Sequence, residues 1–388
     1  MLRRRSFNRA LALVPGAALA GCSLSPEPLP VVSSGRVQRL TGLGFREVEA
    51  RPVDVWLPPG YDGSTRHPVV YLHDGESMFD GATSISKTGW QLDRAVAAWA
   101  AGRAVTPPIL VAVWSLKSQR ASEFLPQPLL DQLSPAARQR AWEQLPLLYK
   151  PFAADLVKRG RSASEAYLRF LVHELKPAID ARFATRPDRA NTFLMGSSYG
   201  GLITVHGVLS HPAAFGAGAA LSTHWIGVLE RNDEISDAAV AWLRRALPSA
   251  AGGLRLYLDR GTIELDAQYP RAQGLVDALL RERGFGPPSV VSRVIEGAGH
   301  NERDWGARAH QALGFLLDGR VAACTTRRRR EELPMTQWTR CSSALSAALW
   351  CVAMAGPPTA GDPATFTRHV DPYIGSAGTG HVTPGATV

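Results

Sequence analysis

The pattern of apolar and polar positions alternates between two kinds of segment along the chain. Short runs at 69–72 and 109–114 are apolar throughout, whereas longer stretches carry apolar residues every three or four positions. Leu168, Leu175 and Ile179 share one face of a helix expected over 164–182. Strands that are apolar on both sides are typical of parallel sheets covered by helices. We therefore predict an α/β fold with a mostly parallel central sheet and helices on both faces.

The same alternation continues through most of the chain. We expect further strands at 53–57, 192–195, 218–221, 254–258 and 290–295, and helices at 90–101, 236–245, 269–283 and 303–317, with another beginning after Tyr199. The segment 126–158 departs from this pattern, because it is rich in Leu, Pro and aromatic residues and is too long for an ordinary loop. We predict a small helical cap insertion there; an inert surface insertion is the alternative.

The N-terminal residues resemble an export signal. A basic cluster at 3–5 precedes a short apolar stretch at 10–20, which is too short to span a bilayer. The small residues directly before Cys22 resemble the lipobox of bacterial lipoproteins, which implies that Cys22 is acylated. A plain cleaved signal is the alternative. We predict a lipoprotein-type signal peptide at 1–22 and a Pro- and Ser-rich tether at 23–35. The protein would then be exported and anchored in a membrane, in the periplasm or at the cell surface.

Charge and cysteine content exclude several classes of function. The formal net charge is +9, but much of the visible basicity lies in clusters at 3–5 and 327–330, outside the expected domain. No stripe of basic and aromatic residues marks a nucleic-acid interface, so we expect no nucleic-acid partner. The sequence has no cysteine between Cys22 and Cys324. A disulfide framework, a cysteine nucleophile and a cysteine-based metal site are therefore excluded from the core.

The stretch Gly196-Ser197-Ser198-Tyr199-Gly200 fits G-x-S-x-G, with a predicted strand before it and a predicted helix after it. In that context the motif forms a sharp turn that lifts the central serine above the sheet edge. Ser198 is therefore the candidate nucleophile, and the backbone N–H of Tyr199 is a candidate oxyanion donor. A serine hydroxyl needs a histidine base that is oriented by a carboxylate.

His300 occupies the position expected for the base, in the loop after the last predicted strand. The acid should follow the strand before it, where Glu264 is our first choice and Asp266 the second. Asp259 ends that strand and could brace the turn instead. We expect the following histidines to be structural or at the surface, although the second and the last could line the pocket: His67, His73, His173, His206, His211 and His224.

The loop after the strand at 69–72 should supply the second oxyanion donor. Gly75 lets the backbone approach a ligand, and the N–H of Glu76 is the candidate donor; a simple Asp-Gly turn is the alternative. The residues that we expect around the substrate are Asp74, Gly75, Arg120, His224 and Trp225. No metal ligands are predicted.

Several motifs together resemble one family. The run from His73 to Asp80 reads H-D-G-x-x-x-F-D, 120–126 reads R-x-x-E-F-x-P, and Gly299 begins a G-H-N-E stretch. With the elbow at 196–200, these motifs resemble the putative esterases, which include enterochelin-type, feruloyl and acetyl-xylan esterases. The resemblance covers about 36–319 and implies an α/β-hydrolase fold and a serine esterase without a cofactor. It also favours Glu264 as the acid.

The ester itself does not follow from the resemblance, because members of this family differ in substrate. We expect hydrolysis of carboxylic esters, with carbohydrate-linked acetyl or feruloyl esters as the candidates. A siderophore trilactone esterase is the alternative within enzymes, and an arginine-lined pocket would mark it. A non-catalytic binding lipoprotein on the same fold is the alternative of another class.

Residues 320–388 do not continue the domain pattern. Met335 begins a stretch with a basic residue, an apolar run at 343–355 and small residues after it, as in a second signal peptide. The following 370–386 resembles the opening of glycoside hydrolase family 92 α-mannosidases. We interpret this tail as the start of a neighbouring gene that has been joined to the esterase; a C-terminal membrane hairpin is the alternative. A neighbour of this kind favours a carbohydrate ester.

Overall fold

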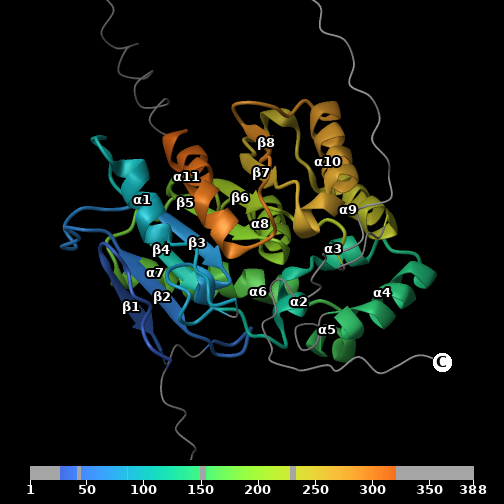
Figure 1. Cartoon of the computed structure of the whole chain (residues 1–388), viewed down its shortest axis with the longest axis horizontal. Coiled ribbons are helices and arrows are strands. Elements are labelled where there is room, and N and C mark those ends of the chain that lie inside the picture. Colours follow the sequence, from blue (N-terminus) through green and yellow to red (C-terminus); the bar gives the residue numbers. More distant parts are fainter. Residues whose placement is uncertain (1–26, 42–44, 85, 149–153, 228–232, 320–388) are drawn as a thin grey trace, which may run out of the picture.

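The computed structural model describes residues 27–41, 45–84, 86–148, 154–227 and 233–319. The predicted signal peptide with Cys22 and the tail at 320–388 lie outside these residues. The described residues form an α/β fold around an eight-stranded sheet with the order β1-β2-β4-β3-β5-β6-β7-β8 (Figure 1). The strands are β1 (Arg36–Leu40), β2 (Val53–Leu57), β3 (Val69–His73), β4 (Ile109–Val113), β5 (Thr192–Ser197), β6 (Ala217–Leu221), β7 (Leu256–Arg260) and β8 (Val290–Val294).

The predicted sheet, mostly parallel, is confirmed. Strand β2 runs antiparallel to both of its neighbours, β1 and β4. Every other pairing, from β4 across to β8, is parallel. The carboxyl ends of β3 to β8 therefore meet at one edge of the sheet, where the reactive groups of open α/β folds gather.

Successive residues of the central strands pack alternately into two hydrophobic cores. Val69 and Tyr71 pack into one cluster, while Val70 and Leu72 pack into the other. Side chains alternate between the faces of a strand. Because both faces are covered, every second position cannot be polar, and the strands are continuous apolar runs.

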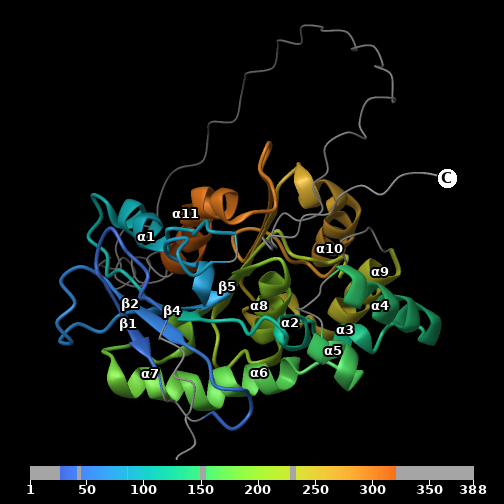
Figure 2. The ribbon, with the colours of Figure 1, turned by 60° about the horizontal axis from the view of Figure 1, so that its bottom comes forward.

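Helices cover both faces of the sheet (Figure 2). On one face, α1 (Leu92–Ala100) packs against α11 (Glu302–Asp318) and the second core. On the other, α6 (Ser164–Phe170), α7 (Lys176–Arg182) and α8 (Tyr199–Ser210) pack into the first core, together with α9 (Asp233–Ala246) and α10 (Pro270–Glu282). The helix expected over 164–182 is continuous, with a π-helical turn at Leu171–Leu175 between α6 and α7.

The segment from 126 to 158 contains α3 (Gln127–Leu130), α4 (Pro135–Leu148) and α5 (Ala154–Arg159), and it follows α2 (Arg120–Phe124). Residues 149–153 of the predicted cap lie outside the described residues. Part of the expected tether contacts the domain: the N–H of Val31 donates to Asp80 at 2.7 Å, and the N–H of Ser33 to Asp93 at 2.6 Å.

Candidate active site

The turn at Ser198 joins β5 directly to α8. Ser198 has φ 56° and ψ −122°, between a strand that ends at Ser197 and a helix that begins at Tyr199. A Cβ on Gly196 would lie 2.8 Å from the backbone carbon and oxygen of Gly200, so the turn requires glycine there. The strained elbow puts the Ser198 side chain at the carboxyl edge of the sheet, where 8% of the residue is exposed.

His300 lies at the same edge, in the loop between β8 and α11. The N–H of His224 donates to the carbonyl of Ser198 at 3.2 Å, and the ring of His224 lies 6.3 Å from the His300 ring between centroids. The rings of Trp305 and Tyr269 flank the imidazole nearly at right angles to it, with ring centroids at 4.9 and 5.7 Å. The structure therefore brings the elbow and His300, which are distant in sequence, to one place.

Asp266, and not Glu264, contacts the imidazole. Oδ1 of Asp266 lies 2.6 Å from Nδ1 of His300, and the Asp266 side chain is fully buried. The carboxylate of Glu264 instead accepts the backbone N–H of His300 at 2.8 Å and the side-chain amide of Asn301 at 3.1 Å. The first choice for the acid thus braces the loop, and the second choice has the geometry of a triad acid.

The reason for this difference lies in the end of β7. The strand was expected to end at Leu258, but it continues to Arg260, and the chain then turns back through a 3-10 helix at Glu264–Gln268. Glu264 has φ 55°, which directs its carboxylate toward the backbone of the neighbouring loop. A Cβ on Gly299 would overlap that carboxylate, so the two loops fit only with glycine at this position.

Asp259, the third candidate, serves another partner. Its carboxylate accepts two hydrogen bonds from the Arg308 guanidinium, both at 3.2 Å, and one from the Tyr257 hydroxyl at 3.1 Å. Burial raises the pKa of Asp259, and the attraction of Arg308 opposes that rise. Asp259 therefore forms a buried ion pair below the site.

The carboxylate of Asp266 is held in its ionised form. Burial disfavours the charge, but the attraction of His300 and the hydrogen bonds from His300, Ser222 and Gly261 outweigh it, so the pKa of Asp266 is lowered. An ionised carboxylate can only accept, so Nδ1 of His300 carries the proton. In the neutral form of the ring, Nε2 then carries no proton and can act as a base.

The loop after β3 lies against the elbow, since a Cβ on Gly200 would lie 3.3 Å from His73 Cβ and 3.4 Å from the Asp74 carboxylate. Asp74 has φ 58°, and a Cβ on Gly75 would lie 2.5 Å from the backbone carbon of Ala112. The side chain of Glu76 turns away from solvent and accepts the backbone N–H of Ser115 at 2.9 Å, in addition to the Ser115 hydroxyl. Burial and the negative charge of Asp74 raise the pKa of Glu76 to about 7. The Glu76 side chain thus fixes the loop whose amide was predicted as an oxyanion donor.

Arg120 lies beside the elbow and is already paired. Its guanidinium donates two hydrogen bonds to the Asp74 carboxylate, at 2.6 and 2.8 Å, and lies 5.6 Å from the centroid of the Tyr199 ring. Burial and the negative charge of Asp74 also raise the pKa of half-buried Glu302, and the attraction of His300 opposes that rise. Arg120, beside the elbow, is thus already neutralised by Asp74.

Two residues expected around the substrate are instead part of the core. Trp225 is 1% exposed and donates its indole N–H to Gln273 at 2.9 Å. His224 is fully buried, and its Nδ1 lies 2.6 Å from the Tyr269 hydroxyl. His73 is also buried, beside the hydroxyl of Tyr167 at 2.9 Å. These buried side chains therefore pack beneath the elbow and do not face solvent.

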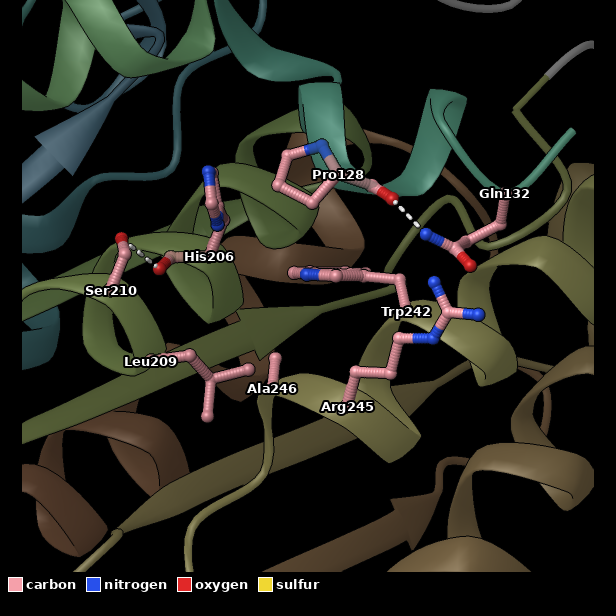
Figure 3. Close-up of a pocket in the computed structure, with 8 residues that line it drawn as sticks. All are labelled: Pro128, Gln132, His206, Leu209, Ser210, Trp242, Arg245 and Ala246. Atoms are coloured by element: carbon pink, nitrogen blue, oxygen red, sulfur yellow. Dashed lines mark hydrogen bonds between the residues drawn. The ribbon is translucent and has the colours of Figure 1, made fainter.

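A cavity of about 300 Å³ lies apart from the elbow, between α8, α9, α3 and the turn after α3 (Figure 3). It contains His206, which is bonded to Glu165 at 2.7 Å, and the ring of Trp242. His206 lies about 10 Å along α8 from Tyr199, at about 1.5 Å per residue. This cavity is therefore not the space above Ser198.

In the ranges that the structure describes, the helices are too short or too polar to cross a membrane. In the same ranges, His, Cys, Asp and Glu side chains do not gather in threes as they would around a metal ion.

Three buried residues behind the acid were not anticipated: Ser222, Trp305 and Arg308. The Ser222 hydroxyl lies 2.5 Å from Oδ2 of Asp266. Arg308 could have been noticed in the sequence, because it lies on the face of α11 that carries Ala312 and Leu316, where a charge needs a buried partner. Ser222 carries no such signal, since a serine after a strand is ordinary.

The chain is similar in sequence to known proteins. Residues 134–316 match the family model described as "Putative esterase". The uncharacterized protein YbbA of Bacillus subtilis is 22% identical over 273 residues, covering 69% of this chain and 92% of that protein. The siderophore triacetylfusarinine C esterase of Aspergillus fumigatus is 31% identical over 149 residues, covering 38% of this chain and 41% of that enzyme.

One solved structure shows the same fold. The enterobactin esterase of Shigella flexneri, crystallised with enterobactin, superposes with a TM-score of 0.50 at 18% identity, covering 74% of this chain and 60% of that one. A ferulic acid esterase superposes with a TM-score of 0.49 at 17% identity, covering 73% of this chain and 98% of that one. At this level of identity the structural likeness concerns the fold.

Proposed function

We propose that this protein cleaves uncharged, carbohydrate-linked acetyl or feruloyl esters through an acyl-enzyme on Ser198. The premise is that residues 134–316 belong to the putative esterase family and that the protein is a carboxylic ester hydrolase. The observation that carries the mechanism is the 2.6 Å contact between Asp266 Oδ1 and His300 Nδ1 beside a G-x-S-x-G elbow. Together these residues supply the nucleophile, the base and the acid of a serine hydrolase.

The proposed reaction uses each of these groups in turn. Nε2 of His300 takes the proton of the Ser198 hydroxyl as its oxygen attacks the ester carbonyl, and Asp266 stabilises the imidazolium that forms. Backbone N–H groups of Tyr199, at the start of α8, and of the Glu76 loop stabilise the oxyanion. The imidazolium then protonates the leaving alcohol. Water, deprotonated by the same histidine, hydrolyses the acyl-enzyme.

Charge supports an uncharged ester over a ferric catecholate complex. The guanidinium of Arg120 is bound by both oxygens of Asp74, and the carboxyl groups of Glu76 and Glu302 are in the field of Asp74. A multiply charged anion would have to displace Asp74 from Arg120 before that guanidinium could bind it, which costs binding energy. The predicted glycosidase start in the tail also supports a carbohydrate ester.

Siderophore trilactones are the second candidate. The similarity to the Aspergillus siderophore esterase, 31% over 149 residues, favours them. A panel of acetylated xylan, methyl ferulate and enterobactin would distinguish the two, with Ser198→Ala as the control for contaminating activity. We expect kcat/KM to be highest for an uncharged ester. Preferential hydrolysis of enterobactin would support the second candidate. If the protein hydrolyses neither these three substrates nor p-nitrophenyl acetate, the alternative of a non-catalytic binding protein is favoured.

We further propose that the protein is exported and anchored through Cys22, with a membrane as its partner. The support is the lipobox-like sequence before Cys22 and the apolar stretch at 10–20. Metabolic labelling with radioactive palmitate tests this. The full chain should incorporate label and Cys22→Ser should not; equal labelling of both would contradict the anchor.

A further inference from the structure

We propose that Ser222, held by Trp305 and Arg308, is a positioning residue. Its hydroxyl donates a hydrogen bond to the triad acid, Asp266, and thereby fixes the ionisation and the orientation of that carboxylate. This inference rests on the proposed function, because it concerns Asp266 as the acid of the triad. Ser222 follows β6 directly and has no exposed surface. Its hydroxyl lies 2.5 Å from Oδ2 of Asp266, on the carboxylate edge away from His300.

The direction of the hydroxyl proton follows from its partners. The indole N–H of Trp305 donates to the Ser222 oxygen at 3.0 Å, and the guanidinium of Arg308 donates to it at 2.7 Å. A serine hydroxyl has one proton and two acceptor lone pairs. Trp305 and Arg308 can only donate, so both lone pairs are occupied. The single proton of Ser222 must therefore point at Asp266.

The same network determines which oxygen of Asp266 faces the imidazole. Oδ2 accepts from the Ser222 hydroxyl and from the backbone N–H of Gly261, each at 2.5 Å. Oδ1 then remains for Nδ1 of His300 at 2.6 Å. Two fixed donors on one oxygen favour the ionised form and prevent rotation of the carboxylate. Ser222 thus acts on Ser198 through Asp266 and His300, without touching a substrate.

The backbone at Ser222 shows that the hydroxyl is held in place. Ser222 has φ 43°, in a region that residues other than glycine rarely adopt. Its N–H donates to the carbonyl of Asp259 at 2.9 Å, and Arg308 pairs with the Asp259 carboxylate. The buried Asp259–Arg308 pair therefore anchors both the turn and one of the two donors to the hydroxyl.

The test measures how fast diisopropyl fluorophosphate labels Ser198, and also kcat and KM for p-nitrophenyl acetate. Ser222→Ala removes one hydrogen bond to the charged acid. We therefore expect labelling and kcat to fall about 10- to 150-fold, with KM little changed. Thr204→Val is the matched control, because it removes another buried hydroxyl, which donates to the Gly200 carbonyl at 2.8 Å without touching the acid.

Two further variants keep the inference falsifiable if Ser222→Ala does not fold. Ser222→Gly suits the positive φ and lacks only the side chain, so a purely conformational role predicts full activity, whereas our account predicts the same loss. Trp305→Phe keeps the ring beside His300 and removes the N–H donor. Its effect on kcat should be smaller and should disappear when Ser222 is already alanine, because both act through one proton.

The outcomes separate this inference from the proposed function. Labelling of the wild type with a slow reaction in Ser222→Ala or Ser222→Gly supports the inference. If the wild type is labelled and the folded Ser222 variants are labelled as fast as Thr204→Val, the role of Ser222 is overturned and the proposed function is not. Failure of the wild-type protein to react at all overturns both.

Discussion

Replacement of Asp266 by asparagine should abolish most activity for a reason that the hydrogen bonds make specific. Oδ2 of Asp266 accepts from Ser222 and Gly261, and Oδ1 faces Nδ1 of His300. The asparagine carbonyl must take the Oδ2 position, because only it can accept those two donors. Its NH₂ group then faces Nδ1. The imidazole is forced into the tautomer with the proton on Nε2, where it cannot accept the proton of Ser198.

The size of the effect can be estimated from the same geometry. The 2.6 Å contact puts the charge centres of the carboxylate and the imidazolium about 4 Å apart. At an effective dielectric constant of about 20, their attraction is about 4 kcal/mol. At about 1.4 kcal/mol per tenfold change in rate, the lost attraction corresponds to a decrease in kcat of about a thousandfold. The wrong tautomer adds to this loss.

The assay is steady-state hydrolysis of p-nitrophenyl acetate by Asp266→Asn, with Glu264→Gln as the matched control. Glutamine can still accept the backbone N–H of His300 through its carbonyl oxygen, so we expect less than a tenfold loss there. A thousandfold loss in Glu264→Gln, together with a loss below tenfold in Asp266→Asn, would refute the reasoning and restore Glu264 as the acid. Circular dichroism of both variants checks that they are folded.

Two further predictions concern stability. Glu123→Gln should lower the unfolding free energy by about 3–5 kcal/mol in a urea titration, because it leaves the Arg51 charge buried and unpaired. Glu282→Gln removes one partner of an exposed pair with Arg244 and should have a much smaller effect, because water screens that pair; equal losses in the two variants would contradict this. Burial raises the pKa of Glu76 from 4.5 to about 7 on folding. The contribution of Glu76 to the unfolding free energy is therefore full below pH 4.5 and is lost as the pH rises to about 7. The difference in unfolding free energy between Glu76→Gln and the wild type should change across that interval by at most about 1.4 kcal/mol per pH unit, and a constant difference would disprove it.

The sequence was most informative where burial dictates composition. Runs such as 109–113 lie between two helical layers, so they must be apolar throughout, and the parallel sheet follows from them. The turn at Ser198 could be located because the sharp bend requires glycine at Gly196. The edge strand β1 was not predicted, because two of its five positions are exposed, two more are half-buried, and two of its residues are arginine.

The choice of acid could not be made from the sequence, for a geometric reason. Glu264 and Asp266 are two residues apart in one loop, and which of them reaches Nδ1 depends on where β7 ends and on the positive φ at Glu264. Neither property is visible in residue type. The supporting hydroxyl of Ser222 is equally invisible, because its role arises from Trp305 and Arg308, more than eighty residues away.

Mapping of the covalent adduct formed by a fluorophosphonate tests the central claim most directly. The wild-type protein is incubated with the probe, digested and analysed by mass spectrometry, with Ser198→Ala and Ser197→Ala in parallel. The account predicts a single adduct on Ser198 that persists in Ser197→Ala and is absent from Ser198→Ala. An adduct on another residue, or no adduct on folded wild-type protein, would contradict it.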